Sequence, residues 1–166
     1  NEKNPTLGNK ELVAHEVGSG AVVFHDLMNE RIGNFDFKLE EVVRFEGDTG
    51  PYVQYANARA QSILRKAGNP ELDMSNLVID DENVWETEKL LADFGDVVRR
   101  AWRDREPSVI AKYALNLSRT FNKYYANSKI LAEDEQLNAR LALVTVVSQV
   151  LTESLRLLGV KAPKEM

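Results

Sequence analysis

The sequence predicts an all-α fold, a helical bundle preceded by a short segment that mixes helix and strand. After residue 50, apolar residues recur with the 3.6-residue period of helices that face a core, and glycine or proline marks most ends of these runs. Four such runs with short connections are typical of a bundle. We therefore divide the 166 residues into a first part, 1–47, and a helical domain, 48–166.

The first part contains three short patterns. GSGAVVFHDL, at 18–27, fits either a helix end or a buried strand, because so short an apolar run has no diagnostic period. IGNFDF, at 32–37, alternates as a short strand does, whereas LEEVVRF, at 39–45, suits one or two helical turns. Since this part has too little apolar surface to fold alone, we expect it to pack against the helical domain or against sequence outside the chain.

The first helix of the domain has clear start and stop signals. Thr49 or Gly50 can cap its start, and Pro51 suits the first turn, where a missing N–H costs nothing. Gly68 and Pro70 end it. Its apolar positions follow the helical period: Val53, Ala56, Ala60, Ile63, Leu64 and Ala67.

The second and third helices are separated by a proline. An acidic connector, 71–96, holds nine acidic residues against Lys89 alone. Within it Asp81 can cap a helix, which ends at Glu106-Pro107, where the next begins. The apolar face of the second helix is Val84, Thr87, Leu91, Phe94, Val98 and Ala101 or Trp102. The apolar face of the third helix is Ile110, Tyr113, Leu117, Phe121 and Tyr124.

The last helix is expected at the centre of the bundle. It begins near 133–135, where acidic side chains suit the positive end of the helix dipole, and LNARLALVTVVSQVLTESLRLLG has apolar residues on most sides. Gly159 ends it in the left-handed conformation, and Pro163 keeps the tail extended. Its expected core residues are Leu141, Val144, Leu151 and Leu155.

Four other residues have structural interpretations. We expect Trp85 and Trp102 to pack against the bundle. Gly47 and Gly50 are interpreted as turn residues that need the φ freedom of glycine.

Composition excludes several classes of protein. The absence of cysteine excludes disulfides, thiol nucleophiles and thiolate metal sites. No apolar run approaches the roughly 20 residues that span a bilayer, and no basic-then-apolar leader is present, so we expect a cytoplasmic protein without a membrane partner.

The net charge of −5 is unevenly distributed along the chain: residues 1–96 hold 9 Lys and Arg against 19 Asp and Glu, and residues 97–166 hold 12 Lys and Arg against 7 Asp and Glu. Because a polyanion responds to local potential, the acidic total does not exclude nucleic acid.

No constellation of residues predicts catalysis. His15 and His25 lack the spacing of metal ligands. GSG at 18–20 has neither the GxGxxG spacing nor the Lys-Ser/Thr pair of phosphate-binding loops. The acidic residues 80–82 suit a helix cap and a solvated loop better than a metal site. We therefore expect no catalytic residue, metal or cofactor within the chain.

FEGDTGPYVQYANARAQSILRKAG, at 45–68, resembles the signature that opens the anticodon-binding domain of arginyl-tRNA synthetases, a class I aminoacyl-tRNA synthetase family. The resemblance extends upstream to VGSGAVVFHDLMNERIGNFDF and downstream to YALNLSRTFNKYYANSKIL, ARLALVTVVSQVLTESLRLLGV and APKEM. Asn57 departs from it, since the family commonly has His there. The HIGH-type and KMSKS-type motifs, which handle ATP, are absent. The resemblance therefore implies a C-terminal fragment without the active site, from an enzyme that uses ATP with Mg²⁺.

The resemblance also implies a partner and a site. The partner is the anticodon stem-loop of tRNA(Arg), the upstream catalytic domain of the same chain is a second contact, and no DNA is expected. The side chains brought to the RNA are Tyr52, Tyr55, Arg59, the pair Tyr124 or Tyr125, and Met166. Those brought to its phosphates are Arg119, Lys123 and Lys129. Unpaired loop bases stack on aromatic rings, and an arginine can donate two hydrogen bonds to a base edge or a phosphate.

Two other interpretations stay open from the residues alone. Tyr52 and Tyr55 can be half-buried packing residues with solvated hydroxyls, in a helical scaffold domain that binds protein and no RNA. An autonomous enzyme is a third class, which the missing motifs disfavour. Salt-dependent binding of a tRNA anticodon arm distinguishes the RNA-binding domain from the scaffold.

Overall fold

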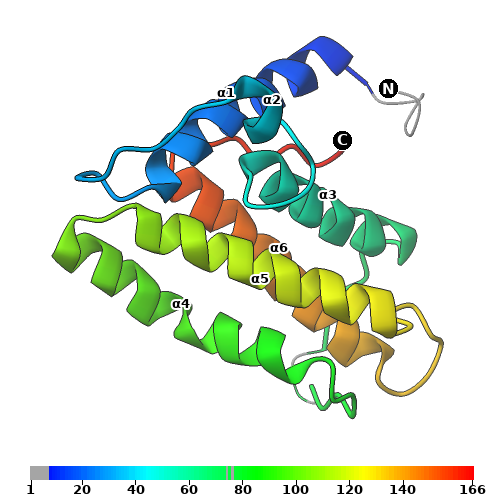
Figure 1. The fold of residues 1–166 in the computed structure, drawn as a ribbon. Coiled ribbons are helices and arrows are strands. Elements are labelled where there is room, and N and C mark those ends of the chain that lie inside the picture. Colours follow the sequence, from blue (N-terminus) through cyan, green and yellow to red (C-terminus); the bar gives the residue numbers. More distant parts are fainter. Residues whose placement is uncertain (1–7, 74, 76) are drawn as a thin grey trace.

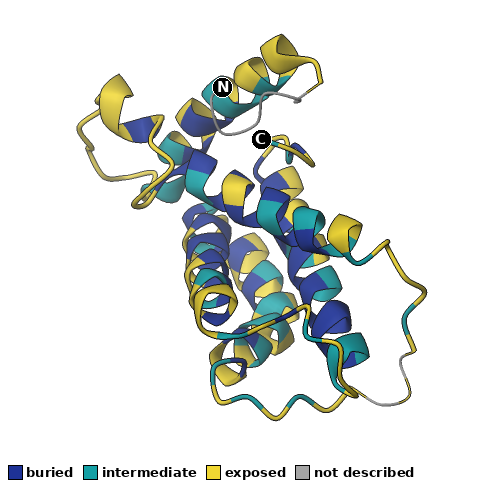
Figure 2. Cartoon of the chain, turned by 90° about the vertical axis from the view of Figure 1, so that its right-hand side faces the viewer, coloured by how far each residue is buried: buried dark blue, intermediate teal, exposed yellow. Residues whose placement is uncertain are grey.

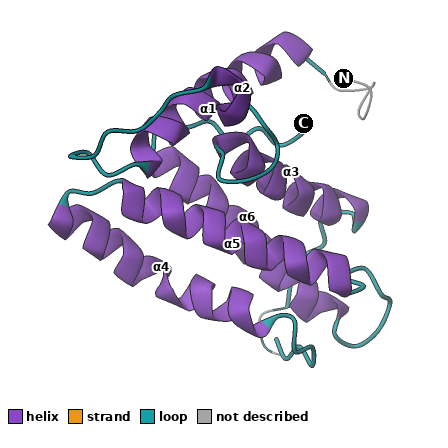
Figure 3. Cartoon of the chain, viewed as in Figure 1, coloured by secondary structure: helices purple, strands orange, loops and turns teal. Residues whose placement is uncertain are grey.

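The computed structural model describes residues 8–73, 75 and 77–166. Over these residues the chain forms six α-helices and no β-strand, which confirms the predicted all-α fold (Figure 3). In chain order they are α1 (Lys10–Met28), α2 (Leu39–Val42), α3 (Gly50–Lys66), α4 (Trp85–Asp104), α5 (Ser108–Asn127) and α6 (Leu137–Leu157). None of these six helices is both long and apolar enough to cross a membrane.

Helices α3, α4, α5 and α6 form the bundle. Helix α6 contacts the other three, α4 lies along α5, and α1 packs against α3 and α5 (Figure 1). The predicted central place of α6 is confirmed by its burial, since Val144, Leu151 and Leu155 are fully buried and Leu141 nearly so. Figure 2 shows the buried residues on the facing sides of the helices and the exposed residues outside.

The start of α3 is fixed by its cap, as predicted. The Thr49 hydroxyl accepts a hydrogen bond from the N–H of Tyr52 at 3.2 Å and donates one to the carbonyl of Arg44 at 2.6 Å. Pro51 lies in the first turn. The cap therefore satisfies one N–H of the first turn and ties that turn to the preceding loop.

Two glycines near this cap have different roles. Gly47 has a φ of +76°, so its interpretation as a turn residue is confirmed. Gly50 is helical instead, and a Cβ there would lie 2.8 Å from the Cβ of Phe24 on α1. Its expected need for φ freedom is wrong, because glycine is required for the close approach of α1 and α3.

The first part of the chain packs against the helical domain, as expected, because Phe24 of α1 belongs to the same hydrophobic core as the bundle. The division of the chain at residue 47 stays a prediction.

The strand expected in the first part is wrong. GSGAVVFHDL lies within the long helix α1, and IGNFDF forms a loop. The two loop phenylalanines pack edge-on against the ring of His25, with centroid distances of 5.2 Å for Phe35 and 5.8 Å for Phe37. Their alternation therefore reflects packing on α1 and not a sheet. The turn of helix expected in LEEVVRF is confirmed by α2.

Both tryptophans of α4 are exposed, so the expectation that they pack against the bundle is wrong. Trp85 is 60% exposed and Trp102 is 82% exposed. Helix α4 lies at the edge of the bundle, and its buried positions are Thr87, Val97 and Ala101. Asp81 is not the N-terminal cap of α4, because its carboxylate accepts the N–H of Asn83, at 2.9 Å, in the turn before the helix.

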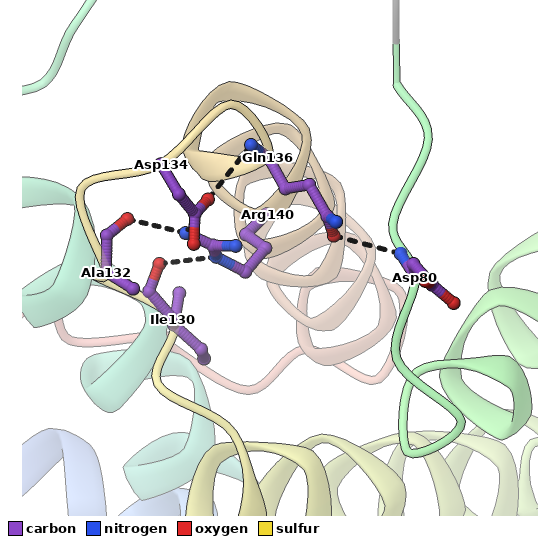
Figure 4. A network of polar contacts seen from close by, with 6 residues as sticks. All are labelled: Asp80, Ile130, Ala132, Asp134, Gln136 and Arg140. Atoms are coloured by element: carbon purple, nitrogen blue, oxygen red, sulfur yellow. Dashed lines mark hydrogen bonds and ion pairs between the residues drawn. The ribbon is translucent and has the colours of Figure 1, made fainter.

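A buried arginine holds the connection between α5 and α6 (Figure 4). Arg140 donates hydrogen bonds to the carbonyls of Ile130, at 2.9 Å, and Ala132, at 2.5 Å, and lies 2.9 Å from the carboxylate of Asp134. The side chain of Gln136 accepts a backbone N–H from the α3–α4 connection at 2.9 Å. The α5–α6 connection, which carries Lys129, is thus tied to α6 and to a second loop.

Candidate nucleic-acid interface

One side of α3 carries polar and aromatic side chains along its length. Tyr55, Arg59, Ser62 and Lys66 are spaced by four, three and four residues, so they lie on the same side of the helix. The opposite side is in the core, where the fully buried residues include Val53, Ala56 and Ala60. Burial of one side therefore turns the other, with the predicted Tyr55 and Arg59, outward.

Arg59 contacts two aromatic rings. Its Cζ atom is 5.0 Å from the ring centroid of Tyr55 and 4.8 Å from that of Tyr125, within the range of cation–π contacts. Its Nη1 donates a hydrogen bond to Oδ1 of Asn122 on α5. Tyr55 is 38% exposed and Tyr125 is 42% exposed. Helices α3 and α5 thus bring a guanidinium and two accessible rings together.

The tail of the chain reaches the same place because α3 holds it. The side chain of Gln54 donates a hydrogen bond to the carbonyl of Lys161 at 2.8 Å. Arg65 donates one to the carbonyl of Lys164 at 3.1 Å and forms an ion pair with the next residue at 3.4 Å. These contacts place Met166 beside Arg59 and the tyrosines.

Together these elements enclose a groove of about 210 Å³, which we name the α3–α5 groove. Its lining includes Tyr55, Arg59, Arg65, Lys66, Tyr125 and Met166. Three lining residues are basic, and Glu165 is the acidic one. The groove is therefore locally positive in a chain whose net charge is −5, as binding of an anionic polymer requires.

A larger hollow of about 570 Å³ lies elsewhere, between α4, α5 and the loop after α1. Its apolar lining includes Leu90, Val97 and Tyr113. Its charged lining is mostly acidic, with Glu30, Asp93, Asp96 and Glu106 against Arg100 and Lys112. Size alone favours this hollow, but its charge repels phosphate, so the smaller α3–α5 groove is the better candidate for RNA. Among the described residues, no group of three or more His, Asp and Glu side chains is placed to hold a metal ion.

Two of the predicted aromatic residues lie outside the groove. Tyr52 is half-buried and packs against the core one turn before Tyr55. Tyr124 is completely buried, so its prediction as an RNA contact is wrong. Burial raises the pKa of the Tyr124 hydroxyl to about 12, and the negative charge of Asp81 adds to this effect. A ring enclosed by the core cannot stack on a base, which leaves Tyr125 as the aromatic residue that α5 supplies.

The three predicted phosphate contacts are exposed but do not line the groove. Arg119 and Lys123 lie one turn apart on α5, and Lys129 lies in the connection that follows. Arg119 forms an ion pair with Asp48, next to the start of α3. None of the three is among the residues that line the groove, so no contact among the described residues links their side chains to it.

Residues 53–166 match the model of the DALR anticodon-binding domain family. The chain belongs to this family. The arginine–tRNA ligase of Leuconostoc mesenteroides is 70% identical over 165 residues, and that of Lactobacillus johnsonii is 69% identical; each match covers 99% of this chain and 29% of the relative. The arginyl-tRNA synthetase of Thermus thermophilus has a similar fold, with a TM-score of 0.90, 39% identity and coverage of 99% of this chain and 29% of that one. The chain thus spans about 29% of the length of these proteins.

The DALR match extends from the first turn of α3 to the tail, so the whole groove lies within it. Asn57, the departure noted in the sequence, lies on the other side of α3. It is nearly fully buried, donates a hydrogen bond to Thr152 at 3.1 Å and accepts one from Ser148 at 2.8 Å. The departure therefore changes a contact between α3 and α6 and leaves the groove untouched.

Sequence reasoning missed three residues of this DALR domain. Lys66 extends the stripe of Tyr55 and Arg59 by two turns, so helical spacing alone could have found it. Arg65 and Asn122 act through contacts with segments far away in the chain, namely the tail and α3. No local pattern indicates such contacts.

Proposed function

We propose that this chain binds the anticodon stem-loop of tRNA(Arg), as the anticodon-binding part of an arginine–tRNA ligase. The observation that supports this most directly is the α3–α5 groove, where Tyr55, Arg59, Tyr125 and Met166 meet in a DALR domain. The relatives that are 70% and 69% identical are named arginine–tRNA ligases, which supports the choice of amino acid.

The chemistry of the groove suits an RNA loop. Unpaired bases of a loop can leave the stack and lie against aromatic rings, each gaining roughly 1–3 kcal/mol. Tyr55 and Tyr125 offer accessible rings, and Arg59, which contacts both rings, offers N–H donors. Met166 supplies a flexible apolar contact beside them. The groove therefore combines stacking with hydrogen bonding, which base recognition needs.

The exposed basic side chains of α5 and of the connection after it have a separate role in this proposal. Lys123 and Lys129 attract loop and stem phosphates, which orients the RNA without selecting its sequence. Arg119 is paired with Asp48 and exchanges that carboxylate for a phosphate when RNA binds. Tyr52 packs against the core from its half-buried position, so in this proposal it touches RNA at most with its edge.

The whole ligase is expected to join arginine to tRNA at the expense of ATP with Mg²⁺, in the cytoplasm. The residues that bind ATP belong to a catalytic domain outside these 166 residues, and that domain is the second partner of this chain. We assign no cofactor, no DNA and no membrane contact to the chain itself.

Binding of stem-loop RNA by the chain tests the proposal. We expect a stem-loop with an arginine anticodon to bind more tightly than a duplex of the same stem, because the groove contacts unpaired bases. Log affinity should fall with log salt by about 0.7 for each phosphate contacted in the loop. Fluorescence anisotropy of labelled RNA over a salt series measures both. A scaffold domain predicts no binding, or binding that does not distinguish the loop from the duplex.

A pair of exposed aromatic residues provides the matched variants. Tyr125→Ala removes a ring from the groove and should weaken stem-loop binding by about 1–3 kcal/mol. Trp102→Ala removes a more exposed ring on α4, outside the groove, and should leave affinity unchanged. Equal losses from the two variants would place the RNA elsewhere on the molecule.

A further inference from the structure

Arg59 is held in the groove by contacts from two helices. It comes from α3, whereas the two groups that hold it in place, Asn122 and Tyr125, come from α5. Tyr55, one turn before Arg59 on α3, is a second ring in contact with its guanidinium. The contact of Arg59 with Asn122 joins residues 63 positions apart, so it depends on the packing of α3 against α5.

The hydrogen bond to Asn122 matters because arginine is a long side chain with many rotamers. An unheld arginine loses that freedom when it binds a ligand, and this loss weakens binding. Asn122 accepts one N–H of Arg59, and two tyrosine rings contact its guanidinium. Of the five N–H donors that an arginine carries, four stay free for a ligand.

A guanidinium has donors and no acceptor, which limits what it can recognise. The group that enters the groove must present acceptor oxygens or nitrogens to Arg59. A base edge and a loop phosphate both do so, but the partly exposed rings of Tyr55 and Tyr125 beside Arg59 favour a flat base.

We propose that Asn122 is a positioning residue for RNA recognition, which holds the Arg59 guanidinium so that its free N–H donors meet the acceptor edge of one unpaired loop base. This inference rests on the proposed function. Asn122 does not itself line the groove, so its effect passes through Arg59.

The test is a panel of stem-loop RNAs in which each loop nucleotide in turn is replaced by an abasic one. Affinities are measured for the wild-type chain, Asn122→Ala, Arg59→Ala and the double variant. We expect Asn122→Ala to weaken binding of the intact loop about three- to tenfold, the range of one hydrogen bond. At one loop position the abasic RNA should bind wild type at least tenfold more weakly than the intact loop does. For both single variants, the difference in affinity between the intact loop and this abasic RNA should be much smaller. In the Arg59→Ala background, Asn122→Ala should change affinity less than twofold.

Two further variants separate positioning from folding. Asn122→Asp keeps an acceptor for Arg59, so it should retain sensitivity at that loop position even though its charge lowers overall affinity. Asn127→Ala is the matched control, since this asparagine of α5 donates to the carbonyl of Lys123 on its own helix at 2.7 Å and does not line the groove. It should leave the whole panel unchanged.

The outcomes that overturn the inference are distinct. If wild type binds and Asn122→Ala loses as much affinity as wild type at every abasic position, Asn122 does not position Arg59. If its effect is undiminished without Arg59, Asn122 acts by another route. If no single abasic replacement weakens binding more than the others, and the Arg59 and Asn122 variants bind every RNA of the panel more weakly by the same factor, Arg59 holds a phosphate. The proposed contact with a base edge is then wrong. If the folded wild-type chain binds no stem-loop, the proposed function itself fails and the inference with it.

Discussion

Tyr124 and Tyr125 are neighbours on α5, yet they belong to different regions of the molecule. Tyr124 is 0% exposed in the core, whereas Tyr125 is 42% exposed and lines the groove. The same residue type therefore serves packing or recognition according to the side of the helix on which it lies. A turn of about 100° per residue decides between the two.

The two regions are also held together by different forces. In the interior of the bundle, α6 is surrounded by apolar side chains, and burial of apolar surface supplies the stability. In the groove, cation–π contacts, one hydrogen bond across α3 and α5 and the tail contacts of Arg65 fix the side chains. We therefore expect interior substitutions to change stability and groove substitutions to change binding.

The largest effect is expected from Leu151→Ala in α6. Leu151 is fully buried, so truncation loses apolar contacts and leaves a cavity, which should cost about 2–5 kcal/mol in the free energy of unfolding. Urea denaturation followed by circular dichroism measures this. Leu157→Ala, at the exposed end of the same helix, is the matched control and should cost far less. Comparable losses would mean that α6 is not the centre of the core.

The second effect is a difference between wild type and Tyr124→Phe at alkaline pH. The pKa of Tyr124 is raised to about 12 by burial and by Asp81, against an ordinary value of 10.0. In the unfolded chain the hydroxyl ionises near pH 10, so the stability that depends on a neutral Tyr124 is complete below pH 10 and is lost as the pH rises towards 12. The loss should reach about 2–3 kcal/mol.

Tyr124→Phe should lack this part of the alkaline loss, which urea midpoints from pH 9 to pH 12 measure. The pKa of Tyr113 is also raised, mainly by burial, but Tyr113 is common to both proteins and cancels in the comparison. At neutral pH the variant should be nearly as stable as wild type, since the Tyr124 hydroxyl has no hydrogen-bond partner in the described part of the chain. Identical pH profiles would show that Tyr124 is not enclosed.

The interior could be predicted from the sequence because helical periodicity encodes it locally. The spacing along α6 placed Leu141, Val144, Leu151 and Leu155 in the core, and all four are buried. The same reasoning failed for Trp102, because periodicity gives a face but not whether a neighbour covers it. At the edge of the bundle, no described residue covers Trp102 of α4 to the extent that the core residues are covered.

The groove could be predicted only in part. Tyr55 and Arg59 share one helix face, so their spacing brings them together. On α5 the helical period had already put Tyr124 on the apolar face, which favours Tyr125 for the groove. The place of Met166, in contrast, depends on contacts of the tail with Gln54 and Arg65, and the position of Arg59 depends on Asn122. Such long-range packing is not encoded in any short window of sequence.

The smallest effect is expected from Tyr55→Phe, which sharpens the comparison from the groove side. The Tyr55 hydroxyl makes no hydrogen bond to any described residue, and the side chain is 38% exposed, so its removal should change the melting temperature by less than about 2 °C, on the order of a few tenths of a kcal/mol. The ring is kept, so its contacts with Arg59 and with Phe45, at a centroid distance of 6.2 Å, should persist. Thermal denaturation of the variant beside Tyr124→Phe at neutral pH measures the difference. A large drop for Tyr55→Phe alone would mean that its hydroxyl is satisfied inside the fold. In that case the outward face of α3 would contribute to stability, and recognition in the groove would depend on Tyr125 and Arg59 without Tyr55.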